Sequence, residues 1–265
     1  RVLQNRESAH PATYLGKGKL EEVKWKVWET EATGIICDDE LSPAQLRNME
    51  EALETKVMDR TMVILDIFAS RANTKEGKIQ VELAQLRFLA VRLAGMRKSL
   101  SRLGGGIGTR GPGETKLETD RRRLHARIGQ LKAELGEVKR HRQVARQQRS
   151  KNQIPVAAIV GYTNAGKSTL LNQLTDAGSL AEDKLFATLD PITRNLRLKD
   201  GQELLVTDTV GFIRKLPHHL VEAFRSTLEE ARHSDIILHV ADCSNPQMEM
   251  QMYVVYETLR QLQIQ

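Results

Sequence analysis

The sequence of 265 residues contains two cysteines, few aromatic residues and no long apolar run. Cys37 and Cys243 lie far apart, each in or beside an apolar stretch, so no paired-cysteine metal site is indicated and we expect buried thiols in a reducing cytosol. No apolar run approaches the length of a membrane span, and no signal peptide is visible. These absences favour a cytoplasmic protein.

Charge of either sign is abundant, with 40 basic and 34 acidic residues and a net charge of +6. The small basic excess suggests a polyanionic partner without proving one. The length suits about two domains and the apolar content is ample for real cores.

The most informative stretch is Gly-Tyr-Thr-Asn-Ala-Gly-Lys-Ser at residues 161–168. It follows an apolar run at 155–160, which predicts a buried parallel strand, and precedes a predicted helix at 168–175. Strand, Gly-bounded loop and Lys-Ser at a helix N-terminus form a phosphate-binding loop, and the alternative is an ordinary turn with an exposed Lys. The predicted nucleotide contacts here are Gly161, Tyr162, Thr163, Asn164, Ala165, Gly166, Lys167, Ser168 and Thr169.

Two later segments predict a magnesium ion and two nucleotide-sensing loops. Thr188 can ligate the metal together with Ser168, and Asp208, which ends an apolar run at 203–207, can hold it mostly through water. Alone, Thr188 could be a turn residue and Asp208 the cap of the next turn. The predicted contacts in these segments are Phe186, Ala187, Thr188, Leu189, Asp190, Asp208, Thr209, Val210 and Gly211.

Two features of many nucleotide switches are missing from the sequence. Where a Gln often orients the attacking water, this chain has Phe212, which forms no hydrogen bond through its side chain. We therefore assign no catalytic residue with certainty and expect slow intrinsic hydrolysis, although Phe212 could equally be packing under the loop. No Asn-Lys-x-Asp motif follows the predicted strand at 235–242, so these residues do not demonstrate guanine selectivity.

The first zone, residues 1–75, predicts a small α/β subdomain. Strands are expected at 32–37, 57–58 and 62–67, and a helix at 43–53 with Ser42 as N-cap and Pro43 at its first position. Strand, helix and strand in this order predict a parallel sheet. The stretch at 14–19 lacks the spacing of a phosphate loop, so a turn before a helix is favoured over a second nucleotide site.

The second zone, residues 76–152, predicts an antiparallel helical hairpin from two matching apolar stripes. The alternative is that each stripe packs on a globular core. The stripes are Ile79, Leu83, Leu86, Ala90, Leu93 and Leu100, and then Leu117, Leu124, Ile128, Leu131, Leu135 and Val138.

Residues 104–113, which join the two stripes, include six glycines and Arg110, and further arginines precede and follow them. The segment is either a flexible linker or a tip that becomes ordered against RNA phosphate. No aromatic residues interleave the basic ones, so backbone and shape contacts are expected instead of base stacking. The predicted ribosomal RNA contacts are Arg102, Gly104, Gly105, Gly106, Arg110, Gly111, Arg121 and Arg122.

Taken together, the motifs at 104–115, 117–121, 161–168, 186–190 and 208–213 resemble those of HflX-type GTPases over essentially the whole chain. The resemblance implies an α/β fold in which a small N-terminal α/β subdomain (1–75) and a helical hairpin (76–152) precede a P-loop G domain (153–265). The G domain has a mostly parallel sheet and lacks the guanine-specificity motif. Phe212 fits a class in which a hydrophobic residue replaces the catalytic Gln.

The resemblance also implies a function. GTP would be the substrate and Mg²⁺ the cofactor of a monomeric protein. It would dock on the large ribosomal subunit near the peptidyl-transferase centre and split stalled or idle ribosomes. The alternatives are a GTPase of ribosome assembly or tRNA modification, and an RNA-binding module that needs no nucleotide.

Overall fold

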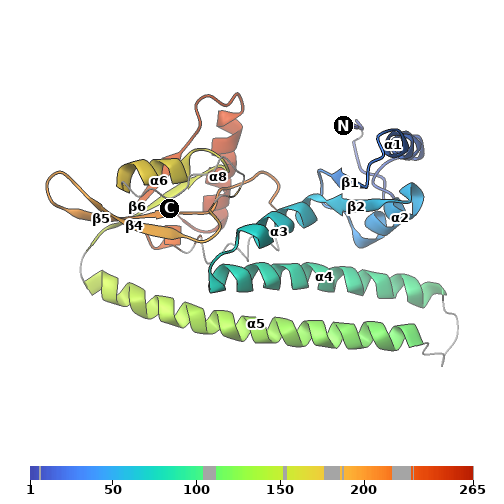
Figure 1. Cartoon of the computed structure of the whole chain (residues 1–265), viewed down its shortest axis with the longest axis horizontal. Helices are drawn as coiled ribbons and strands as arrows, with labels where there is room; N and C mark the ends of the chain where they lie inside the picture. The colour runs from blue at the N-terminus through green and yellow to red at the C-terminus, as the bar shows by residue number, and fades with distance from the viewer. Residues whose placement is uncertain are drawn as a thin grey trace. The chain divides into compact units, whose positions relative to one another are not determined.

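The computed structural model of the chain describes residues 1–5, 7–103, 112–151, 154–175, 186, 188–216, 228 and 230–264 (Figure 1). Within 94–103, 112–117 and 145–151 only the backbone is described. The chain packs into two compact units: Arg1–Asp66 with Leu86–Arg127, and Ile67–Gln85 with Ile128–Gln265. Because the helices of the middle zone are shared between these units, the division at residues 75 and 152 stays a prediction.

The first unit contains a parallel two-stranded sheet with two helices. Its elements are α1 (Lys17–Glu29), β1 (Gly34–Cys37), α2 (Pro43–Leu53) and β2 (Lys56–Asp59). Strands β1 and β2 pair in parallel with Gly34 opposite Lys56, as strand, helix and strand in sequence predicted. Helix α2 begins with a capping box in which Ser42 Oγ accepts from the N–H of Gln45 at 3.2 Å, so the predicted start and end of this helix are confirmed.

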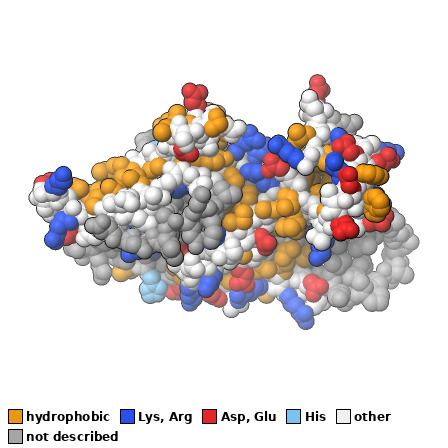
Figure 2. Space-filling model, turned by 45° about the horizontal axis from the view of Figure 1, so that its top comes forward, with side chains coloured by type: hydrophobic (Ala, Val, Ile, Leu, Met, Phe, Trp, Pro, Cys, Tyr) orange, Lys and Arg blue, Asp and Glu red, His pale blue; other side chains and the backbone are white. Residues whose placement is uncertain are grey.

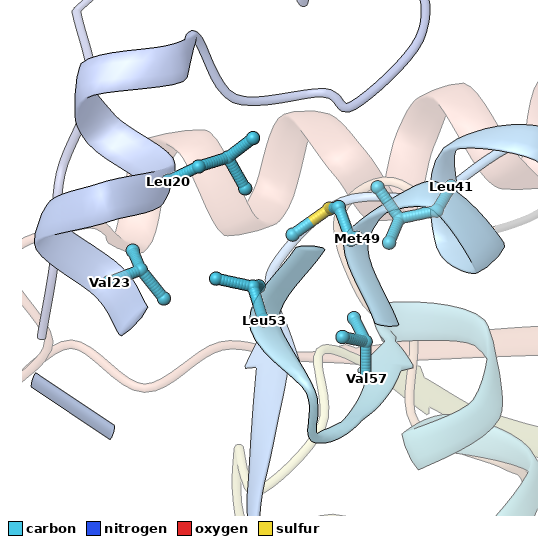
Figure 3. Packing of buried hydrophobic residues seen from close by; sticks show 6 residues of the cluster. All are labelled: Leu20, Val23, Leu41, Met49, Leu53 and Val57. Carbon is cyan, nitrogen blue, oxygen red and sulfur yellow. The ribbon is translucent and has the colours of Figure 1, made fainter. Parts of the chain in front are cut away.

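The core of this unit lies between the helices and the sheet (Figure 3). Residues 14–16 turn into α1, so a turn before a helix, the favoured interpretation of residues 14–19, is what the structure has. The side chains that fill the core come from α1, α2, β2 and the residue before Ser42: Leu20, Val23, Leu41, Met49, Leu53 and Val57.

The predicted strand at 62–67 is wrong, because this apolar run lies in helix α3 (Arg60–Arg71). Asp59 ends β2, and its Oδ1 accepts the N–H of Met62 at 2.9 Å, as an N-cap side chain does. The buried apolar residues Ile64, Leu65 and Phe68 then recur at helical spacing. A short apolar run cannot be assigned to strand or helix by its pattern alone, and the cap decides here.

Two long helices follow, α4 (Lys75–Leu103) and α5 (Pro112–Lys151), and residues 104–111 between them lie outside the described residues. Arg142 near the end of α5 pairs with Glu76 at the start of α4, so the helices run antiparallel, as the hairpin prediction requires (Figure 1). Ile79, Leu83 and Leu131 of the predicted stripes are buried. In α4, Gln80, Val81 and Ala84 are buried as well, so its first turns pack on more than one side.

The second unit holds a four-stranded sheet in the order β4-β5-β3-β6. Central strand β3 runs parallel to β5 and β6, while β4 pairs antiparallel with β5. Ile159, Leu171 and Val206 are buried between the sheet and α6. The elements are β3 (Val156–Gly161), α6 (Lys167–Thr175), β4 (Ile192–Arg197), β5 (Glu203–Asp208), β6 (Ile236–Val240) and α8 (Met248–Gln261), which confirms the predicted strands before, beside and after the phosphate loop.

Basic and acidic side chains lie interspersed on the face drawn in Figure 2. Both cysteines are free, but Cys37 is half-buried and Cys243 is exposed, so the expectation of two buried thiols is wrong. Cys243 lies beyond the end of β6, in a turn outside the sheet.

None of the helices in the described part of the chain combines the length and the apolar character of a membrane span.

Candidate nucleotide-binding site

The predicted phosphate loop leaves the carboxyl end of β3, the strand between β5 and β6. Gly161 lies so close to β6 that a Cβ atom there would be 2.3 Å from the carbonyl oxygen of Val240. The loop then turns through Asn164 and Gly166, which have φ of 59° and 89°, and α6 begins at Lys167. This path brings the amino end of α6, where backbone N–H groups are free to bind an anion, to the edge of the sheet.

The phosphate loop is hydrogen-bonded to the segment that follows Asp208. The N–H of Thr163 donates to the carbonyl of Phe212 at 2.8 Å, and the N–H of Phe212 donates to the carbonyl of Gly161 at 3.0 Å. Between these bonds, a Cβ on Gly211 would lie 2.6 Å from Thr163 Cα and 3.0 Å from Lys167 Nζ. The backbone of Gly211 therefore lies directly against the loop and its lysine.

Lys167 has only 6% of its surface exposed, and its Nζ donates to the carbonyl of Tyr162 at 2.9 Å. Burial lowers the pKa of Lys167 to about 8, and the nearby negative charge of Asp208 acts in the opposite direction. The site thus holds a buried ammonium group with one carbonyl acceptor, which suits it to receive phosphate oxygens.

The three predicted metal ligands converge at the same end of the sheet. Ser168 Oγ lies 2.8 Å from Thr188 Oγ1, and both hydroxyls donate to Asp208 Oδ2, at 2.7 and 2.8 Å. Asp208 is fully buried, and its Oδ1 has no hydrogen-bond partner among the described residues. Burial raises the pKa of Asp208, while the bonds from Ser168 and Thr188, the charge of Lys167 and the neighbouring backbone N–H of Thr209 act to lower it.

This donor set fits a magnesium ion. Mg²⁺ prefers oxygen ligands, and P-loop sites hold it with a hydroxyl and a carboxylate that often acts through water. A buried carboxylate oxygen that lacks a donor costs free energy unless a cation or water satisfies it. The described residues contain no group of three His, Cys, Asp or Glu side chains able to hold a metal, and a site of this kind needs none.

The loop that carries Thr188 is anchored on both sides. Phe186 is buried with φ of 54°, and its N–H donates to Thr163 Oγ1 at 3.2 Å. Its ring packs against the ring of Phe68 in a T-shaped arrangement, with 4.9 Å between the two ring centroids. Leu189 is buried as well, whereas the predicted contact Ala187 lies outside the described residues.

Asp190, another predicted nucleotide contact, directs its carboxylate to the start of α4. Oδ2 accepts the N–H groups of Asn73 and Thr74 at 3.0 and 2.9 Å. Sequence reasoning missed these partners. Thr74 before a helical stretch is an N-cap signal, but nothing in the sequence links it to a residue so distant.

The structure thus brings Lys167, Ser168, Thr188, Asp208 and Gly211 together, although their roles toward a nucleotide stay predictions. The predicted RNA contacts are placed only in part. Arg121 and Arg122 are exposed on α5, where Arg122 pairs with Glu118 at 3.6 Å. For Arg102 only the backbone is described, and Gly104, Gly105, Gly106, Arg110 and Gly111 lie outside the described residues.

Three family models match consecutive parts of the chain. Residues 1–69 match the GTP-binding GTPase N-terminal family, and residues 71–149 match the GTP-binding GTPase middle region. Residues 156–264, which include the phosphate loop, match the 50S ribosome-binding GTPase family.

Individual relatives agree with these matches. The chain is 79% identical over 264 residues to the GTPase HflX of Lacrimispora saccharolytica and 50% identical over 261 residues to that of Escherichia coli. The chain belongs to the HflX GTPase family. It spans 62% and 61% of the lengths of these two HflX proteins, which cover 100% and 98% of it.

A solved structure has a related fold. The crystal structure of SsGBP in complex with GDP superposes with a TM-score of 0.53 and is 28% identical to this HflX-family chain. The match covers 98% of this chain and 69% of SsGBP. The fold described above is thus found in a protein whose structure contains GDP, in agreement with the predicted α/β class.

Proposed function

We propose that this chain provides the GTP- and Mg²⁺-binding machinery of a GTPase that docks on the large ribosomal subunit near the peptidyl-transferase centre. There it splits stalled or idle ribosomes into subunits, acting in the cytoplasm as a monomer. Membership of the HflX GTPase family and the match of residues 156–264 to 50S ribosome-binding GTPases support this proposal.

The observation that carries the nucleotide part is the convergence of Ser168 and Thr188 on Asp208, whose Oδ1 has no donor among the described residues. Three residues from a helix start, a loop and a strand end meet at one point. A merely structural cluster would have no need to leave a buried carboxylate oxygen without a donor.

In this proposal each residue has a separate task. Lys167 exchanges its bond to the Tyr162 carbonyl for oxygens of the β- and γ-phosphates, which raises its pKa again. Ser168 and Thr188 would hold the metal through their hydroxyl oxygens, and Asp208 would hold it mostly through water. When bound, Mg²⁺ would neutralise charge on the phosphates.

Hydrolysis by this site is proposed to be slow until the ribosome binds. Phe212 has 2% of its surface exposed, and its backbone is hydrogen-bonded to Gly161 and Thr163. Its hydrocarbon side chain carries no donor or acceptor that could orient a water molecule. We propose that docking on the large subunit reorganises the segment around Phe212 and so accelerates turnover. Rapid turnover of the isolated protein, without stimulation by large subunits, would contradict this step.

The proposal is tested by Ser168→Ala in the full-length protein, with the exposed Ser70→Ala as matched control. Ser168→Ala is expected to weaken GTP binding at low Mg²⁺ concentration, with partial recovery as Mg²⁺ is raised, and to reduce subunit splitting in parallel. Ser70→Ala should match the wild type. Nucleotide binding by the wild type without splitting would favour a GTPase of ribosome assembly or tRNA modification, and the absence of nucleotide binding would favour an RNA-binding module.

A further inference from the structure

The first turn of α4 is capped by residues from two distant parts of the chain. Thr74 Oγ1 accepts the N–H of Gly77 at 3.0 Å, as an N-cap threonine does. Asp190 adds a second layer: its Oδ2 accepts the N–H groups of Asn73 and Thr74, and its Oδ1 accepts the Thr74 hydroxyl. A carboxylate at this end of a helix is also favoured by the helix dipole.

Gly77 makes the room for this carboxylate. A Cβ on residue 77 would lie 2.2 Å from Asp190 Oδ1 and 3.0 Å from its Cγ. Residue 77 lies inside α4, where Ala is ordinarily preferred over Gly. The close approach of Asp190 therefore gives a physical reason for a glycine at a helical position.

Asp190 follows Thr188, the threonine of the predicted metal site, by only two residues in the chain. Two residues of fully extended chain span at most about 7 Å, so Thr188 cannot move far while Asp190 stays on α4. On the other side of Thr188, Phe186 is held against Phe68. The loop is thus held at both ends, with Thr188 on Asp208 between them.

The same turn of α4 is bound to α5. Glu76, next to Gly77, pairs with Arg142, whose Nη1 also lies 3.7 Å from Glu230 Oε1. All three side chains are largely buried, so the contact is screened little by solvent. A shift of the first turn of α4 would therefore be felt by both helices of the hairpin.

We propose that Asp190 is a positioning residue that couples the Thr188 loop to the first turn of α4. The coupling rests on the proposed function, because it assumes that Thr188 senses GTP. When Thr188 engages Mg²⁺ and the γ-phosphate, Asp190 holds the capped turn; when Thr188 is released, the cap weakens. Coupling between sites is reciprocal. If GTP changes the affinity for a partner that moves α4, that partner changes the affinity for GTP by the same factor.

Nucleotide titrations of the full-length protein test this coupling, with a GTP analogue that is not hydrolysed and with GDP, both with Mg²⁺. Asp190→Ala and Thr74→Val are expected to weaken binding of the analogue about tenfold, a typical strength for coupled sites. Thr74→Val, which changes no predicted nucleotide contact, should leave GDP affinity unchanged. Thr74→Ser, which keeps the hydroxyl, should restore wild-type binding. Gly77→Ala should act like Asp190→Ala, although it changes no residue of the nucleotide site and favours the helix.

Hydrogen exchange at the amides of residues 73, 74 and 77 supplies a readout that does not depend on activity. In the wild type these amides should exchange more slowly with the analogue than with GDP, and in Asp190→Ala the difference should vanish. Equal loss of analogue and GDP binding in Thr74→Val, or full analogue affinity in both Asp190→Ala and Gly77→Ala, would overturn the coupling. A wild-type protein that binds neither nucleotide would overturn the proposed function itself.

Discussion

At the scale of single residues, Lys167 sets the conditions under which the site can accept phosphate. Its ammonium is buried, and its pKa is lowered to about 8 mainly by loss of solvent. Phosphate oxygens would favour the charged form and raise this pKa. The bound state therefore holds more protons than the free state at pH values above about 8, so affinity is expected to fall as the pH rises through this value.

This pH dependence can be measured by calorimetric titration of GTP in buffers of different ionisation enthalpy. We expect proton uptake on binding at pH 8.5 to 9 and almost none near pH 6.5, where the lysine is already charged in the free protein. Lys167→Ala should lose nucleotide binding and with it the proton uptake. If the affinity for GTP did not change between pH 6.5 and pH 9, a group other than Lys167 would have to bind the phosphates.

The residues of the site were predictable to different degrees. Ser168 and Asp208 could be placed together from sequence because a helix start and the end of a parallel strand meet at one edge of a sheet. The contact of Asp190 with Thr74 could not, because it joins loops 116 residues apart in the chain and neither residue carries a signal for the other.

At the scale of elements, Asp59 joins several parts of the first unit. It is fully buried; Oδ1 caps α3 at Met62, and Oδ2 accepts the N–H of Leu41 at 3.3 Å and Arg92 Nη2 at 2.6 Å. The Arg92 guanidinium lies 4.0 Å over the ring of Phe88. One carboxylate thus caps a helix, fixes a loop and neutralises a mostly buried arginine.

Asp59→Ala is expected to lower the free energy of unfolding by about 3–5 kcal/mol, because it leaves a buried charge without its partner. Chemical denaturation of the full-length protein, followed by circular dichroism, measures the change. The matched control is Glu203→Ala, which removes the partner of Arg197 in a surface pair with side chains 37% and 77% exposed. It should cost no more than about 1 kcal/mol. Equal effects of the two substitutions would contradict the role given to Asp59.

Elements with a local signal were the predictable ones. Helix α2 carries its own start in Ser42, Pro43 and Gln45, and its limits were predicted from these residues. Helix α3 was mistaken for a strand because its apolar residues are contiguous and its cap, Asp59, also ends a strand. The burial of Gln80, Val81 and Ala84 in α4 was not predicted either, because the apolar stripe describes only one face of the helix.

In the whole molecule, nucleotide binding and the proposed action on the ribosome are assigned to different segments of the chain. Helix α4 has 29 residues and rises about 44 Å at 1.5 Å per residue, so the segment at 104–113 is joined to the Asp190 contact through a long helix. Arg110→Glu is expected to leave GTP binding intact and to weaken ribosome splitting and ribosome-stimulated hydrolysis. The reason is that a negative charge repels RNA phosphate.

The exposed Arg122→Ala, on α5, serves as a comparison for Arg110→Glu because it removes one charge without adding a repulsive one. Its effect on splitting should be smaller and should diminish at higher salt. Unimpaired splitting after residues 104–113 are shortened would show that the segment is only a linker. Loss of GTP binding in the same variant would show that this segment and the nucleotide site depend on each other.

Sedimentation of whole ribosomes mixed with the full-length protein and Mg²⁺, with GTP, with GDP or without nucleotide, tests whether the nucleotide site drives subunit splitting. We expect that GTP converts ribosomes into free subunits, that GDP and protein alone do not, and that Lys167→Ala and Asp208→Ala abolish the conversion. Splitting that is equally efficient without nucleotide, or that survives in both variants, would contradict the claim that the Ser168, Thr188 and Asp208 site drives the function.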